Sequence, residues 1–178
     1  MGDESTDPVA IRALGQPGDL GWVVLVHGEV YAHEFGWDSS FEALVARIVA
    51  DYAAGPEDGE RAAGRQAAWI ADVGGRRVGC VFCLPAASSP EEPSTAQLRL
   101  LLVHPQGRGH GLGGRLVDAC VEFARDAGYQ RIRLWTNDPL VAARGIYLDR
   151  GFVLGEQQPH RSFGVDLIGQ VYELDLPR

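Results

Sequence analysis

The most informative absence in this 178-residue chain is lysine, since every one of its 16 basic side chains is an arginine. This excludes chemistry that depends on a phosphate-binding P-loop lysine or on a Schiff-base lysine. Hydrophobic runs are also short, and none approaches the roughly 20 residues needed to cross a bilayer. The acidic N-terminus, M-G-D-E-S-T-D-P, lacks the basic and apolar regions of a signal peptide. We therefore expect a soluble cytoplasmic protein that does not act at a membrane.

Excess positive charge is absent as well. The formal net charge is −8, whereas a nucleic-acid-binding protein needs a basic face to neutralise phosphates. We therefore expect no nucleic-acid partner. The length and the 46% hydrophobic content fit one domain over residues 1–178, with a flexible segment at residues 1–8.

Cysteine is scarce, at three residues, and this argues against a secreted disulfide framework. Cys80 and Cys83 form a C-x-x-C sequence in a predicted strand, where residues three apart point to opposite faces. We interpret them, together with Cys120 on the apolar face of a predicted helix, as buried structural residues. No spacing of His, Asp and Glu suggests a metal site, so we expect no bound metal.

Hydrophobic periodicity, caps and glycines predict a mixed α/β domain of about seven strands and about four helices. Helices are expected over Asp19–Trp37, Ser39–Gly55, Leu112–Gly128 and Asp138–Gly151. Strands are expected over Val9–Leu14, Ala67–Val73, Arg77–Leu84, Ala96–Val103, Arg131–Thr136, Phe152–Glu156 and Gln170–Leu176. Loops are expected over Gly55–Gly64 and Pro85–Ser94. Gly74-Gly75 joins two of the strands as a hairpin.

The segment from Val103 to Val117, V-H-P-Q-G-R-G-H-G-L-G-G-R-L-V, places five glycines between a strand and a helix. The first N–H groups of a helix lack internal partners, and glycine lets a phosphate approach them closely. The segment therefore predicts an anion-binding loop. Gly109, Gly111 and Gly114 also match the G-x-G-x-x-G of dinucleotide-binding enzymes. That alternative is weaker, because additional residues separate the strand from the first glycine and antiparallel strands precede it.

The same loop resembles motif A of the GNAT N-acetyltransferase superfamily, a strand ending in V-x-P followed by Q/R-x-x-G-x-G/A. Here Val103-His104-Pro105 precedes Arg108-Gly109-His110-Gly111-Leu112-Gly113. The later A-A-R-G-I-Y-L-D-R-G-F, Ala142 to Phe152, resembles motif B. More narrowly, two C-terminal stretches look like the acetyltransferase half of bacterial proteins that fuse a MarR-type DNA-binding domain to a GNAT domain.

The resemblance implies an acetyl-CoA-dependent N-acetyltransferase that acts by direct transfer in a ternary complex. It implies a GNAT-like fold in which the two parallel strands ending at Val103 and Thr136 splay around the cofactor. The backbone of Leu101, Leu102 and Val103 would pair with the pantetheine arm. Tyr147 matches the family's tyrosine that protonates or hydrogen-bonds the departing CoA thiolate. The residues implied to bind acetyl-CoA are completed by Arg108, Gly109, His110, Gly111, Leu112, Gly113, Gly114 and Asn137.

The chain departs from the family pattern in two places. The usual motif-B asparagine falls at Leu140, and Asn137, three residues earlier, is a possible substitute. Many members carry a glutamate that acts as general base on the strand before motif B, and this position is Trp135 here. The proton acceptor is therefore open among Glu29, Glu34 and His33, and we select Glu34. Residues expected to contact the acceptor are Glu29, Tyr31, Trp37, Trp135 and His160.

Two further functions stay open at this point. A non-catalytic acyl-CoA-binding module would explain the missing glutamate and asparagine, and a dinucleotide-binding oxidoreductase would explain the literal glycine match. For an enzyme of the GNAT type, the expected partner is an amine-bearing small molecule or peptide. The resemblance also makes a homodimer an open alternative to a monomer.

Overall fold

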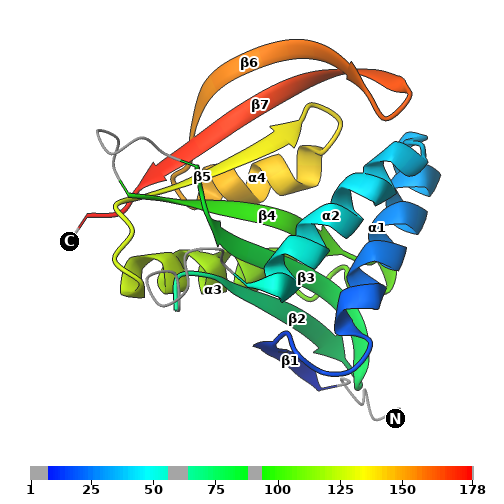
Figure 1. Cartoon of the computed structure of the whole chain (residues 1–178), viewed down its shortest axis with the longest axis horizontal. Coiled ribbons are helices and arrows are strands. Elements are labelled where there is room, and N and C mark those ends of the chain that lie inside the picture. The colour runs from blue at the N-terminus through cyan, green and yellow to red at the C-terminus, as the bar shows by residue number, and fades with distance from the viewer. Residues whose placement is uncertain (1–7, 56–63, 88–93, 178) are drawn as a thin grey trace, which may run out of the picture.

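The computed structural model describes residues 8–55, 64–87 and 94–177, within which seven strands and four α-helices form one layered unit (Figure 1). The helices are α1 (Asp19–Phe35), α2 (Ser39–Ala54), α3 (Leu112–Asp126) and α4 (Val141–Asp149), and a short 3-10 helix covers Pro105–Gly107. The strands are β1 (Val9–Ala13), β2 (Ala67–Val73), β3 (Arg76–Pro85), β4 (Thr95–Val103), β5 (Arg131–Asn137), β6 (Val153–Ser162) and β7 (Val165–Asp175). The flexible segment expected at residues 1–8 lies outside the described residues except for Pro8.

All seven strands belong to one sheet in the order β1-β2-β3-β4-β5-β7-β6. The pair β4 and β5 is parallel, and the other neighbours in the sheet are antiparallel. This confirms the mixed α/β sheet and its splayed parallel pair. It also differs from the all-parallel, doubly wound sheet that a dinucleotide-binding fold requires.

Helices cover both faces of the sheet (Figure 1). On one face, valines of α1 and α2 pack on Ile70, Cys80 and Phe82. On the other face, α3 and α4 pack on a second core that contains Cys83 and Cys120. Cys80 and Cys83 therefore point to opposite faces, as the strand geometry predicts, and the described cysteines are free and buried.

The parallel pair separates part of the way along its length. Pairing of β4 with β5 runs from Thr95 opposite Arg131 to Leu98 opposite Leu134 and then stops, although both strands continue. On its other side, β4 contains an extra residue against β3, and Leu100 has a φ of 54°. Such a bulge bends a strand and increases its twist. The backbone of β4 after Leu98 is thereby left without a strand partner on the β5 side.

Three sequence-based boundaries were wrong. The last helix begins at Val141 rather than at Asp138, because the Asp138 carboxylate accepts a hydrogen bond from the backbone N–H of Ile168 (2.7 Å) and fastens β5 to β7. The last two strands are longer than expected and meet in a tight turn at Phe163 and Gly164, both with positive φ. His160 therefore lies in β6 and not in a loop.

Two local features explain why the N-terminal helices sit where they do. Gly28, which weakens the helical pattern, allows α1 to approach α2 closely, since a Cβ there would lie 2.7 Å from Glu42 Oε2. The buried Asp19 carboxylate accepts hydrogen bonds from Arg12, Arg77 and two backbone N–H groups, which join β1, α1 and β3. Among the described residues, no helix is both long and apolar enough to span a membrane.

Candidate active site

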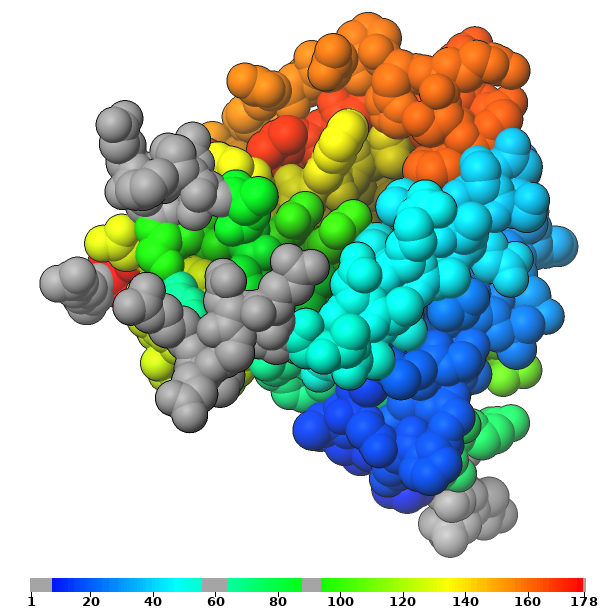
Figure 2. Space-filling model, viewed as in Figure 1, coloured from blue at the N-terminus to red at the C-terminus, as the bar shows by residue number. Residues whose placement is uncertain are grey.

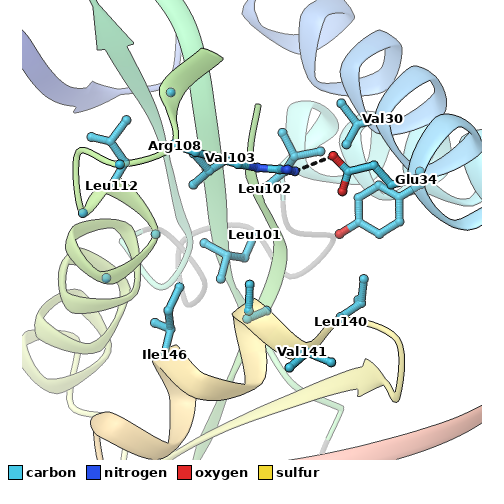
Figure 3. A pocket seen from close by; sticks show the side chains of 18 of the residues that line it. Val30, Glu34, Leu101, Leu102, Val103, Arg108, Leu112, Leu140, Val141 and Ile146 are labelled. Carbon is cyan, nitrogen blue, oxygen red and sulfur yellow. Dashed lines mark hydrogen bonds and ion pairs between the residues drawn. The ribbon is translucent and has the colours of Figure 1, made fainter. Parts of the chain in front are cut away.

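The first of two cavities lies where β4 and β5 separate, and it measures about 620 Å³. Its walls come from α1, from Leu101–Val103 of β4, from the glycine loop and the start of α3, and from α4. Figure 3 shows Leu101, Ile146 and Leu140 directed toward this space from three different elements. The residues that line this cavity are mostly apolar, and the glycine loop forms part of its wall.

The start of α3 provides free hydrogen-bond donors on this wall. Its first helical bond runs from the N–H of Arg115 to the carbonyl of Gly111 (3.2 Å). The N–H groups of Leu112, Gly113 and Gly114 therefore have no partner within the helix, and no side chain caps it. Gly111 has a φ of 65°, a conformation that glycine adopts without strain. This is the geometry of an anion site at a helix N-terminus.

An ion pair joins the glycine loop to α1. The Arg108 guanidinium donates to the Glu34 carboxylate at 2.6 Å, as the dashed line in Figure 3 shows. Glu34 lines this cavity and not the second one, and it has the only carboxylate among the described residues that line either cavity. Glu34 therefore lies on the wall of the first cavity, held by Arg108.

The second cavity, of about 430 Å³, opens on the α2 side of the sheet. Figure 2 shows the surface hollowed between α2 and the β6–β7 hairpin. An aromatic group forms one wall: Trp37 contacts Tyr31, Phe41 and Phe163 with ring centroids 4.7–5.0 Å apart. Polar groups from β4, β5 and β6 form the opposite wall.

The two cavities share Tyr31, Leu101, Leu140 and Ala143, so they meet at the gap between β4 and β5. Tyr147 of α4 lines the second cavity beside this junction and is 4% exposed. Burial, followed by the nearby Tyr31, raises the pKa of Tyr147 well above its usual value. Its phenol is therefore a neutral hydrogen-bond donor at physiological pH.

A hydrogen-bonded chain of three side chains lines the second cavity. His160 Nε2 donates to Asn137 Oδ1 at 2.8 Å, and Ser162 Oγ lies 2.9 Å from His160 Nδ1. With Nε2 protonated, Nδ1 of the neutral ring accepts the Ser162 hydroxyl proton. Asn137, expected on the cofactor side, is instead placed on the wall of the second cavity.

The structure brings most, but not all, of the expected residues to these cavities. Leu101, Leu102, Val103, Arg108, Gly109 and the Gly111–Gly114 segment line the first cavity, and Tyr31, Trp37, Trp135 and His160 line the second. Glu29 and His33 are exposed on α1 and line neither. The His110 ring folds back onto the loop carbonyls of Gly107 and Arg108 and also lines neither cavity. Among the described residues, no group of three or more His, Cys, Asp or Glu could hold a metal ion.

Sequence reasoning missed Arg99, Ser162 and Phe163, which line the second cavity. A signal existed for Arg99, since it is one charged residue inside the otherwise apolar stretch L-R-L-L-L-V. Ser162 and Phe163 gave no such signal, because their position depends on the unexpected length of β6.

Comparison with known proteins identifies the same fold and family. Residues 27–152 match the model of the acetyltransferase (GNAT) family. An uncharacterised N-acetyltransferase of Schizosaccharomyces pombe is 30% identical over 155 residues, which cover 85% of this chain and 87% of that protein. Rat N-acetyltransferase family 8 member 2 is 38% identical over 84 residues, 47% of this chain; the match spans 37% of the rat protein's length.

Solved structures agree on the fold. The Salmonella typhimurium protein yncA, determined with its cofactor acetyl-CoA, superposes with a TM-score of 0.75 at 19% identity, and the match covers 95% of this chain and 94% of yncA. A ribosomal-protein-alanine N-acetyltransferase from Brucella melitensis gives a TM-score of 0.72 at 17% identity, over 94% and 99% of the two chains. At such identities, the likeness concerns the fold alone.

Proposed function

Because the chain belongs to the GNAT family of acetyltransferases, for which acetyl-CoA is the cosubstrate, we propose that it acetylates an amine by direct transfer in a ternary complex. The observation that carries this proposal is the meeting of two cavities at the gap between β4 and β5. One cavity has an anion site in its wall, and the other opens toward solvent past an aromatic wall. The two substrates can thus enter from opposite sides and meet at Leu101 and Leu140.

The first cavity fits acetyl-CoA. The free N–H groups at the start of α3 suit a pyrophosphate, and the guanidinium groups of Arg108, paired with Glu34, and of Arg150, paired with Asp118, lie on the same cavity wall. On the side of β4 that faces β5, the backbone of Leu101–Val103 has no strand partner, and this free edge suits the amide groups of the pantetheine arm. When bound, acetyl-CoA supplies an acetyl group already activated as a thioester.

During transfer, a bond forms between the amine nitrogen and the acetyl carbon, and the bond from that carbon to sulfur breaks. We propose that Tyr147 donates a hydrogen bond to the departing sulfur. Its raised pKa makes it a weaker acid than the thiol, whose usual pKa is near 8.5. Tyr147 therefore stabilises the developing charge by hydrogen bonding, CoA leaves as the thiolate, and the thiolate takes its proton from solvent water after the transfer.

The amine must also lose a proton, since an amine such as that of lysine is mostly protonated at neutral pH. Glu34 stays a prediction for this role, but it lines the cofactor cavity and is paired with Arg108. The geometry favours His160, because it lines the acceptor cavity and its Nδ1 can accept a proton through Ser162. Asn137 then stabilises the charged ring by accepting the hydrogen bond from Nε2.

Leu140 lies at the junction of both cavities, so an apolar side chain occupies the position of the usual motif-B asparagine. Asn137 lines the second cavity and accepts a hydrogen bond from His160, so its proposed role is in the acceptor half of the site. The narrower likeness to the acetyltransferase half of MarR fusion proteins stays a prediction, as do the homodimer and the cytoplasmic location.

The decisive experiment is release of free CoA thiol from acetyl-CoA over a panel of amines, with the acetylated amine identified by mass spectrometry. Formation of both products with at least one amine supports the proposal. Tight binding of acetyl-CoA with no product from any amine would instead identify a non-catalytic acyl-CoA-binding module.

A further inference from the structure

Arg99 gives the acceptor cavity an unusual charge. The cavity wall contains this guanidinium but, among the described residues that line it, neither aspartate nor glutamate. Arg99 comes from β4, two residues before Leu101, where the two cavities meet. Its charged group therefore belongs to the same space that the acceptor amine must enter.

The Arg99 guanidinium has no ion-pair or hydrogen-bond partner in the described chain. Other partly buried arginines do have one: Arg133 binds Glu173 at 2.6 Å and Arg77 binds Asp19 at 2.7 Å. Burial lowers the pKa of Arg99, and the charge of Asp51 opposes this effect. Arginine nevertheless stays charged in proteins. A partly desolvated cation without a bonded anion is unfavourable, and an incoming carboxylate would satisfy its planar set of N–H donors.

The rest of the cavity indicates what accompanies the carboxylate. The wall built by α2, by the segment before it and by the hairpin turn is apolar, with Trp37, Phe41, Leu44, Ile48 and Phe163, and His27 of α1 adds a buried imidazole to the lining. The volume of about 430 Å³ lies within the range of roughly 300–1,000 Å³ that is typical of small-molecule pockets. The cavity thus combines a cation, a proton-accepting histidine and an apolar wall.

We propose that the acceptor is a small amine that also carries a carboxylate and an apolar side group, the chemistry of a hydrophobic free amino acid. The carboxylate binds Arg99, the side group packs on the aromatic wall, and the amine points to the junction beside Tyr147. This inference rests on the proposed acetyl transfer. It disfavours polycationic acceptors such as polyamines, which would meet Arg99 and no carboxylate on the described wall.

Matched pairs of acceptors test the proposal. We expect kcat/KM to be at least 10-fold higher for L-phenylalanine than for phenethylamine, which lacks the carboxylate. Arg99→Gln should reduce kcat/KM for L-phenylalanine by about 10- to 100-fold and leave phenethylamine almost unaffected. Arg99→Lys should recover part of the loss. Arg47→Gln is the control, since Arg47 is exposed on α2 and lines neither cavity.

A binding measurement separates this inference from the proposed function. Trp37 and Trp135 line the cavity, so tryptophan fluorescence can follow L-phenylalanine binding in the presence of free CoA, when no transfer is possible. Binding that Arg99→Gln abolishes and Arg47→Gln preserves supports the carboxylate site even if turnover is absent. Equal binding to wild type and Arg99→Gln, tighter binding of phenethylamine, or acetylation restricted to a polyamine such as spermidine would overturn it.

Discussion

Replacing Gly111 with valine removes the close approach on which the anion site depends. Gly111 precedes α3 with a φ of 65°, and a Cβ at this position would meet no atom within 4 Å. The Cβ of the new side chain therefore meets no neighbouring atom in the free protein. The branched side chain lies beside the free N–H groups of α3. The valine must also adopt the left-handed backbone conformation, which costs an L-residue about 1–2 kcal/mol.

The magnitudes follow from mass action. Acetyl-CoA at a hundredfold excess over its dissociation constant should stabilise the wild-type protein by about 2.7 kcal/mol. For a domain of this size, that corresponds to an increase in Tm of about 5–11 °C. Gly111→Val should lower the Tm of the free protein by about 2–8 °C, in line with its backbone cost. Acetyl-CoA should then raise the variant's Tm by less than about 2 °C.

The assay is thermal unfolding with and without acetyl-CoA, and NADH serves as the ligand for the dinucleotide alternative. Gly145→Val is the matched control, because Gly145 is in α4, lines neither cavity and also has no atom within 4 Å of a Cβ. This control should keep the full acetyl-CoA shift. An unchanged shift in Gly111→Val, or a larger shift with NADH than with acetyl-CoA in the wild type, would refute the assignment of the loop.

Three other predictions concern stability and proton transfer. Burial lowers the pKa of His27 from 6.5 to about 4, so between these pH values the unfolded chain binds a proton that the folded chain does not. The free energy of unfolding should therefore fall by about 3 kcal/mol from pH 6.5 to pH 4 in urea titrations, and His27→Phe should remove most of this pH dependence. Asp19→Asn should cost about 3–5 kcal/mol of unfolding free energy in the same assay at pH 7, since it leaves Arg77 without a carboxylate and Arg12 with Asp72 alone. A loss below 1 kcal/mol would contradict the buried network. His160→Asn should reduce kcat by about 100-fold or more and Glu34→Gln by less, whereas the reverse order would return the proton-acceptor role to Glu34.

Most of the residues that the sequence assigned to acetyl-CoA line the first cavity, because this cavity is built largely from local backbone structure. A strand, a run of glycines and a helix define the anion site within a few residues of one another, and Gly111 adopts the positive φ that the pattern requires. The order of elements and the mixed sheet were confirmed for the same reason, since each helix and strand has its own periodicity and caps.

The acceptor half depends on contacts between distant segments, and these were not predictable. Arg99 and His160 meet in one cavity because the β6–β7 hairpin extends toward α2. β6 lacks the alternation of polar and apolar residues that identifies a half-buried strand, because it is exposed over most of its length and consists mainly of polar residues. The last helix was expected to begin at Asp138, but the Asp138 carboxylate accepts a hydrogen bond from Ile168, 30 residues away.

The central claim is that acetyl transfer takes place where the two cavities meet, beside Tyr147, and Tyr147→Phe tests it most directly. The variant keeps the ring, which is buried against Phe152 and Tyr172, and loses only the hydroxyl. We predict unchanged acetyl-CoA affinity in thermal unfolding and a decrease in kcat of about 10²- to 10³-fold for whichever amine the panel identifies. Wild-type turnover in the variant would contradict the account.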